Sequence, residues 1–121
     1  MKDAQTDAPW DDRARLLRVM AHPVRLMILR ALRERPQCVK DINSLVSIVQ
    51  PHLSQHMAAL RKAGLVDCHV CGALRCYYVV RPTLVKSMLR LLSEEHPVRL
   101  RSRNAVLRAS RRAEAVEADT D

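Results

Sequence analysis

The segment SIVQPHLSQHMAALRKAGLV, residues 47–66, has the features of a complete helix with its own start and stop signals. Pro51 suits the first turn of a helix, where a missing N–H costs nothing, and Gly64 stands where a left-handed cap is common. Apolar residues at positions i, i+4 and i+7 predict one buried stripe. This stripe consists of Leu53, Met57 and Leu60.

The opposite face of this helix is small, polar or basic. Its residues are Pro51, His52, Gln55, Ala58, Ala59 and Lys62, flanked by Gln50, Ser54 and Arg61. A solvated surface helix of this length usually carries a carboxylate, and residues 47–66 contain none. Short polar side chains near the N-terminus of a helix can reach base edges in the major groove. The pattern therefore favours a DNA recognition helix over an ordinary amphipathic surface helix.

Length and charge narrow the class of protein. A chain of 121 residues is long enough for one domain with short tails. With one Trp, two Tyr and no Phe, its core must be aliphatic, and a helical fold of this size gains from burying surface in a second copy. Residues 13–112 hold 20 of the 21 Lys and Arg but only 5 of the 13 Asp and Glu. Such a basic body indicates a phosphate-rich partner.

The ends of the chain bear on its location. Residues 1–12 are acidic and polar, unlike a secretory signal, and no apolar run approaches the length of a membrane span. We therefore expect a cytoplasmic protein with no membrane partner. In that compartment the four cysteines are reduced thiols rather than a disulfide framework.

The elements expected along the chain give a mainly α fold with a small β-hairpin. Residues 1–10 read as a flexible acidic tail, residues 11–96 as the folded domain, and residues 97–121 as a tail that is Arg-rich and then acidic. The expected elements are a helix from Asp11 or Asp12 to about Ala21, a buried helix from Pro23, an extended piece at 37–40, a helix capped by Asp41, the recognition helix, strands at 65–70 and 74–80, and a helix at 83–95.

Two helices joined by a short turn, the second suited to a groove, make a helix-turn-helix. The hairpin directly after the recognition helix is then a wing, whose His69 and Arg75 can touch phosphate or the minor groove. The apolar stripe of the helix at 83–95 reads as a dimer surface. The Arg-rich segment beyond it is either a frayed helix or a disordered arm, with or without DNA contact.

Several local strings resemble the ArsR/SmtB family of winged-helix repressors over roughly residues 15–92. They are MAHPVRLMIL at 20–29, QPHLSQHM at 50–57, LRKAGLV at 60–66, and the Tyr77-Tyr78 pair. The resemblance implies a homodimer formed by the first and last helices. It also implies binding to an inverted repeat in a double-stranded DNA operator, and release when an effector binds.

The departures from the family concern the effector. Metal-sensing relatives often carry Cys-Val-Cys-Asp before the third helix, whereas this chain has Cys38-Val39-Lys40-Asp41, in which an ammonium replaces one thiolate. The family's alternative zinc site on the last helix is missing, because residues 83–95 contain no histidine. His22 and His56 stand at family positions that indicate packing rather than metal ligation.

The cysteines offer three hypotheses. The first is a soft-metal or metalloid site for arsenite, cadmium, mercuric ion or zinc, formed by Cys38, Cys68, Cys71 and Cys76. Strand alternation points Cys68 and Cys71 to opposite faces unless the turn at Gly72 bends Cys71 inward. The second hypothesis, equally well supported, is a regulatory disulfide between Cys38 and Cys76, which lie on adjacent strands. This disulfide would form in response to an oxidant or a persulfide. The third hypothesis is that the thiols are small buried hydrophobes. No cofactor is obligatory in any of these.

An enzyme has little support in this sequence. Ser54 with His56, or a cysteine with His69, lacks a third orienting group, and two glycines cannot build a glycine-rich phosphate loop. Two function classes therefore stay open. One is a promoter-specific dimeric repressor controlled through its thiols, and the other is a basic nucleic-acid-binding module without an effector.

Overall fold

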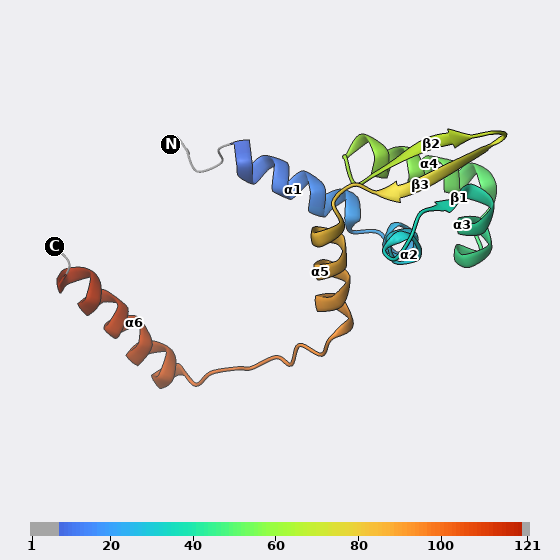
Figure 1. The fold of residues 1–121 in the computed structure, drawn as a ribbon. Helices are drawn as coiled ribbons and strands as arrows, with labels where there is room; N and C mark the ends of the chain where they lie inside the picture. The colour runs from blue at the N-terminus through green and yellow to red at the C-terminus, as the bar shows by residue number, and fades with distance from the viewer. Residues whose placement is uncertain (1–7, 120–121) are drawn as a thin grey trace.

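The computed structural model describes the backbone of residues 8–119 and the side chains of residues 9–49 and 51–112 (Figure 1). Its elements are α1 (Ala8–Met20), α2 (Pro23–Leu32), β1 (Gln37–Cys38), α3 (Val39–Val46), α4 (Gln50–Lys62), β2 (Val66–Cys71), β3 (Leu74–Val79), α5 (Pro82–Ser93) and α6 (Arg103–Asp119). This order confirms the winged helix-turn-helix. It adds α6, which lies apart from the body at the end of an extended segment (Figure 1).

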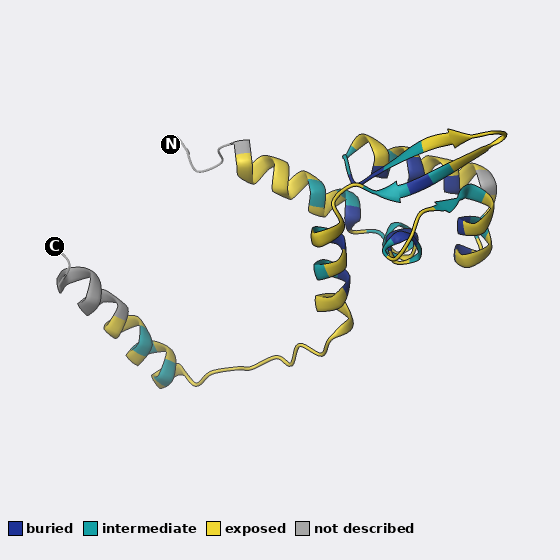
Figure 2. Ribbon diagram, in the orientation of Figure 1, coloured by how far each residue is buried: buried dark blue, intermediate teal, exposed yellow. Residues whose placement is uncertain are grey.

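Helix α2 is the centre of the core, as its broad apolar circumference predicts. It contacts α1, α3, α4, α5 and β3. Every element of the body except β1 contributes buried residues to this core (Figure 2). They are Met20, Ile28, Leu29, Leu32, Ile42, Val46, Leu53, Met57, Leu60, Leu65, Val66, Tyr77, Val85 and Leu89. The predicted stripe Leu53, Met57 and Leu60 belongs to this set.

The sheet has three antiparallel strands in the order β1-β3-β2. Cys71 pairs with Leu74, so the hairpin turns through Gly72 and Ala73 alone. Gly72 has a φ of 65°, the left-handed conformation that two-residue hairpin turns require. The pairing of Cys38 with Cys76 confirms that the short extended piece joins the second wing strand.

Two helix starts differ from the expectation. α1 begins at Ala8, so residues 8–10 belong to it rather than to the tail, and Asp11 lies in its first turn. α3 begins at Val39 and not at Asp41, because the chain turns into the helix directly from the extended Cys38. Cys38 occupies the N-cap without a side-chain hydrogen bond. Asp41 instead places its carboxylate in the first turn, where the helix dipole favours it.

The end of the chain takes the helical alternative over residues 103–119. α5 ends at Ser93, and Glu94 is extended. Residues 94–102 are exposed and carry no regular structure, and the Ser102 hydroxyl accepts from the Ala105 N–H at the start of α6. The expected N-terminal tail up to residue 7 and the last two residues lie outside the described part. None of the described helices is both long and apolar enough to cross a membrane.

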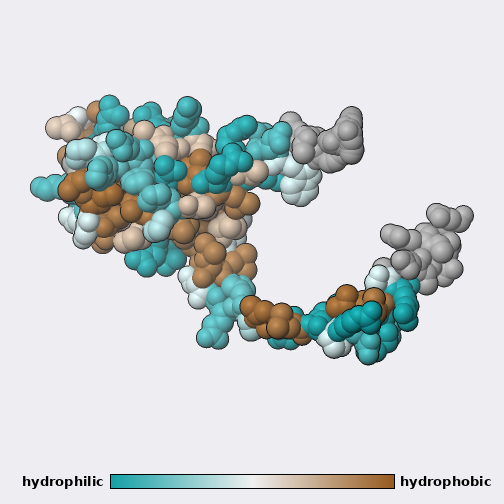
Figure 3. Space-filling model, turned by 180° about the vertical axis from the view of Figure 1, so that it is seen from behind, coloured by the Kyte–Doolittle hydropathy of each residue, from teal (hydrophilic) through white to brown (hydrophobic). Residues whose placement is uncertain are grey.

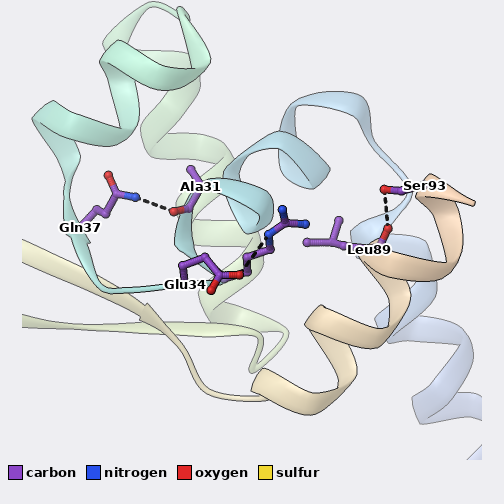
Figure 4. Close-up of polar contacts among 6 residues, drawn as sticks. Ala31, Glu34, Gln37, Leu89 and Ser93 are labelled. Atoms are coloured by element: carbon purple, nitrogen blue, oxygen red, sulfur yellow. Dashed lines mark hydrogen bonds and ion pairs between the residues drawn. The ribbon is translucent and has the colours of Figure 1, made fainter.

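Side-chain hydrogen bonds lie near the ends of α2 and α5 (Figure 4). The Gln37 amide donates to the Ala31 carbonyl, which ties β1 to the end of α2. The Ser93 hydroxyl donates to the Leu89 carbonyl at 2.8 Å in the last turn of α5. An ion pair between Arg33 and Glu34, 3.5 Å long, lies near the same end of α2.

Substitutions at two residues of α3 test whether burial in this core stabilises the helix-turn-helix. Ile42 is 0% exposed and Leu45 is 58% exposed. Ile42→Ala should lower the free energy of unfolding by about 2–5 kcal/mol, because it leaves a cavity among packed side chains. Leu45→Ala, the control on the same helix, should cost less than about 1 kcal/mol. Chemical denaturation measures both, and equal losses would contradict this account of the core.

Candidate nucleic-acid interface

Helix α4 presents the face that the sequence predicts for recognition. Burial of its apolar stripe against the body turns the other side outward. The exposed residues of α4 are Pro51, His52, Ser54, Gln55, Ala58, Arg61 and Lys62. Gln50 begins the helix, and its side chain lies outside the described part. The exposed face therefore runs from hydrogen-bonding groups at the N-terminal end to two cations at the C-terminal end.

His56 belongs to the packing of α4 and not to its exposed face. Arg25 on α2 donates through Nε to Nδ1 of His56 at 3.1 Å, and the rings of His22 and His56 are 4.5 Å apart. Nδ1 of His22 accepts from the Val24 N–H at 3.1 Å, which caps α2. Burial, then the charges of His22, Arg25 and His52, lower the pKa of His56. A neutral His56 thus accepts the bond that ties α4 to α2.

A hollow of about 360 Å³ lies between α4 and the wing. Its lining includes Ser54, Ala58 and Arg61 from α4 and Arg75 from β3. Of the residues predicted for DNA contact, the structure therefore brings Ser54, Arg61 and Arg75 together. A backbone phosphate beside α4 would meet groups of both elements here.

His69 is not part of this group. Val70 pairs with Arg75, and His69 pairs with Cys76, so Arg75 and His69 lie on opposite faces of the hairpin. His69 stacks on Tyr78, with ring centroids 5.5 Å apart and planes 11° from parallel. The sequence predicts that both residues can touch DNA, and the register places them on opposite faces of the wing.

Two arginine contacts at the C-terminal end of α4 were not anticipated. Arg61 Nε lies 3.0 Å from Asp67 Oδ1 on β2. A hydrogen bond from the Cys68 N–H, followed by the bond from Arg61, lowers the pKa of Asp67. Arg81 Nε donates to the Gly64 carbonyl at 3.0 Å. Arg61 therefore fixes α4 to the wing, with the rest of its guanidinium open to solvent. The sequence does not predict the contact between Arg61 and Asp67, because a separation of six residues fits neither a helical pair nor a cross-strand pair.

The strand register divides the four free thiols between two faces. Cys38 stands directly opposite Cys76, and Cys71, two residues beyond His69, shares their face. Cys68 stands opposite Tyr77 on the other face and packs against the core. The hypothesis of one site with all four thiolates is therefore wrong, because strand alternation separates Cys68. Within the described residues, no three His, Cys, Asp or Glu side chains are placed to hold a metal ion.

Cys76 interacts with its neighbours on that face. A hydrogen bond with the Cys71 thiol, followed by burial and the charges of Cys71, Cys38 and Asp41, raises the pKa of Cys76. Cys71 is exposed, whereas Cys38 and Cys76 are half-buried. Of the three thiols on this face, Cys71 is therefore the most accessible to solvent.

Sequence comparisons identify the family of this fold. The model of the arsR family of bacterial regulatory proteins matches residues 22–67. The HTH-type transcriptional regulator MJ1325 of Methanocaldococcus jannaschii is 34% identical over 86 residues, which cover 70% of this chain and 96% of that protein. The transcriptional activator HlyU of Vibrio cholerae is 39% identical over 77 residues, 64% of this chain and 70% of HlyU. The chain belongs to the ArsR family.

Solved structures agree with this assignment. Reduced HlyU of Vibrio cholerae superposes on the ArsR-family chain with a TM-score of 0.63 at 35% identity, covering 68% of this chain and 85% of HlyU. The transcriptional repressor BigR of Xylella fastidiosa gives a TM-score of 0.66 at 26% identity, covering 78% and 100%. The ArsR-family chain is thus a DNA-binding transcriptional regulator.

The burial of His56 beside the charges of His22, Arg25 and His52 should make the stability of this ArsR-family protein depend on pH. The folded state lowers the pKa of His56 below its ordinary value of 6.5 and so binds that proton less readily than the unfolded state. The contribution of neutral His56 to the free energy of unfolding is fully present above pH 6.5. This contribution is lost as the pH falls through 6.5 towards the pKa of the folded state. The free energy of unfolding, measured between about pH 7.5 and about pH 5.5, should fall.

His56→Asn, whose amide oxygen can accept from Arg25 but cannot be protonated, should flatten this dependence. His96→Asn, beyond the end of α5, should leave the dependence of the wild type in place. Parallel profiles for the wild type and His56→Asn would show that His56 does not carry the effect.

Proposed function

We propose that this ArsR-family regulator is a homodimeric, cytoplasmic repressor that binds an inverted-repeat operator and leaves it when a signal acts on its cysteine thiols. The observation that carries the proposal is the exposed, carboxylate-free face of α4 beside the hollow that it shares with Arg75. Ser54 and Gln55 supply hydrogen bonds for base edges, whereas Lys62 and Arg75 supply charge for phosphates. Pro51 and His52 shape the leading end of the helix.

An apolar surface away from the wing supports the dimer. A groove of about 320 Å³ there is lined only by apolar side chains of α1, α2 and α5 and of the turn after α1. Its lining residues are Leu17, Met20, Ala21, Leu26, Met88 and Leu92. Figure 3 shows hydrophobic side chains gathered where α5 leaves the body. A second copy packed on α1 and α5 would cover them, and two-fold symmetry would present two copies of α4 to two half-sites.

The thiols support an effector that reacts with two sulfurs rather than four. A tetrahedral zinc or cadmium centre is complete only with four ligands, and Cys68 faces the core. Arsenite or mercuric ion needs fewer thiolates, so a soft metalloid on Cys38 and Cys76 is one candidate signal. An oxidant is the other, and the direct opposition of Cys38 and Cys76 favours it.

Two matched variants of α4 test the readout of bases. An operator is first selected from a pool of random duplexes, and binding to it and to an unrelated duplex is followed by fluorescence anisotropy. Gln55→Ala should lose about 1–3 kcal/mol of discrimination between the two duplexes, because a base-edge contact is removed. Lys62→Ala should weaken both alike and reduce the salt dependence by about one phosphate contact. Equal losses by both variants on every duplex would favour the basic module without sequence preference.

A charge on α5 tests the dimer surface. Leu92 is 58% exposed in the apolar groove, and Leu74 is 52% exposed at the wing. Leu92→Glu should shift the protein from dimer to monomer in sedimentation velocity, because an unpaired carboxylate would be buried at the interface. Leu74→Glu, the control, should remain dimeric. If the Leu92→Glu variant stayed dimeric, the dimer interface would not lie on this groove.

A further inference from the structure

Three thiols share the face of the wing sheet that points away from the core. Opposite residues of antiparallel strands point the same way, so Cys38 on β1 and Cys76 on β3 are neighbours across the sheet. Cys71 on β2 lies on the same face, diagonal to Cys76 across the hairpin. Cys76 is thus the central thiol, with one neighbour on each adjacent strand.

We propose that Cys38 and Cys76 form a reversible disulfide when the protein meets a peroxide, with Cys71 as the thiol that is oxidised first. The effect of this disulfide on DNA rests on the function proposed above, whereas its formation does not.

The backbone geometry suits a bond between Cys38 and Cys76. Directly opposed residues of antiparallel strands have Cα atoms about 4.5–5.5 Å apart, and disulfides join Cα atoms about 4.4–6.8 Å apart. Diagonal neighbours such as Cys71 and Cys76 have Cα atoms about 7–8 Å apart, so a disulfide between these two hydrogen-bonded thiols is strained and easily broken. The Cys38–Cys76 bond is therefore the expected end product.

Exposure makes Cys71 the point of first attack. Cys71 lies at the turn of the hairpin beside Gly72 and is exposed, whereas Cys38 and Cys76 are half-buried. Oxidation of a thiol by peroxide depends on access and on the thiolate. The raised pKa of Cys76 reduces its thiolate fraction and so disfavours it as the first nucleophile.

The sequence of reactions balances with one peroxide and two thiols. The Cys71 thiolate attacks a peroxide oxygen, the O–O bond breaks, and the alcohol or water leaves with a proton, which gives Cys71 sulfenic acid. The Cys76 thiolate attacks that sulfur, the S–O bond breaks, and water leaves. The Cys38 thiolate then attacks the Cys76 sulfur and releases the Cys71 thiolate. Peroxide is reduced, Cys38 and Cys76 are oxidised, and Cys71 is restored.

The disulfide would join the two parts of the interface. Cys38 is the N-cap of α3, the first helix of the helix-turn-helix. Cys76 follows Arg75, which lines the hollow beside α4. A covalent bond at this pair would therefore fasten the wing strand to the start of α3 and restrict the adjustment of Arg75 to a phosphate. We expect the oxidised protein to bind the operator more weakly.

Mass spectrometry of the full chain treated with hydrogen peroxide tests the pair. The wild type should give a Cys38–Cys76 linkage. Cys71→Ser should give the same linkage about tenfold more slowly, because the exposed entry thiol is gone. Cys38→Ser should stop at Cys71–Cys76, since the final exchange has no thiol. Cys68→Ser, on the other face, is the control and should behave as the wild type.

Other products would overturn the proposal. A linkage that includes Cys68, a Cys71–Cys76 end product in the wild type, an equal rate in Cys71→Ser, or reduced Cys38 and Cys76 after peroxide would each do so. Release of the operator by arsenite without any disulfide under peroxide would also overturn it, in favour of a metalloid site.

Anisotropy with the selected operator separates this proposal from the function it rests on. Peroxide should weaken operator binding by the wild type at least about tenfold, dithiothreitol should restore it, and Cys76→Ser should not respond. A disulfide that forms without changing affinity would refute the regulatory step and leave the operator-binding function standing. A protein that prefers no duplex would refute the proposed function, while the linkage map still decides the thiol chemistry.

Discussion

The interface depends on the burial of one stripe of α4. Leu53, Met57 and Leu60 are removed from solvent against the core built around α2. Each such side chain contributes about 1.5–3 kcal/mol when buried. A rotation of the helix by one residue would bury polar neighbours such as Ser54 and expose this stripe. Apolar burial therefore decides which residues of α4 face outward.

Polar contacts then fix the position of α4 along and across the body. Arg25 holds the middle of the helix through His56, and Arg61 holds its C-terminal end through Asp67. Arg81 secures Gly64, just beyond the helix. Base recognition requires side chains placed within fractions of an ångström by their supporting residues. Among the described side chains, the N-terminal half of α4 forms no such bond to the wing, which leaves its polar groups available.

Local signals made most of this fold predictable. Pro51 and Gly64 mark the limits of α4, and Gly72 marks the hairpin turn, because each requires a particular backbone conformation. The start of α3 was missed because its N-cap, Cys38, forms no side-chain bond and so leaves no capping signal.

The site was less predictable because it depends on register and on distant contacts. His69 and Arg75 are both basic residues of the wing, but the exact pairing of β2 with β3 places them on opposite faces. A shift of one residue would reverse every side chain, and composition does not determine it. The contact between Arg25 and His56 joins residues that are 31 positions apart, and only tertiary packing creates it.

The same alternation separates two roles within the wing. On β3, Arg75 and Tyr77 point towards α4, whereas Cys76 between them points to the outer face with Cys38. A reagent can therefore reach the exposed Cys71 without entering the surface proposed for DNA. Because one planar peptide bond joins Arg75 to Cys76, a shift of the backbone at Cys76 also moves Arg75. Under the proposal, the sheet couples oxidation on one face to the position of the proposed phosphate contact, Arg75, on the other.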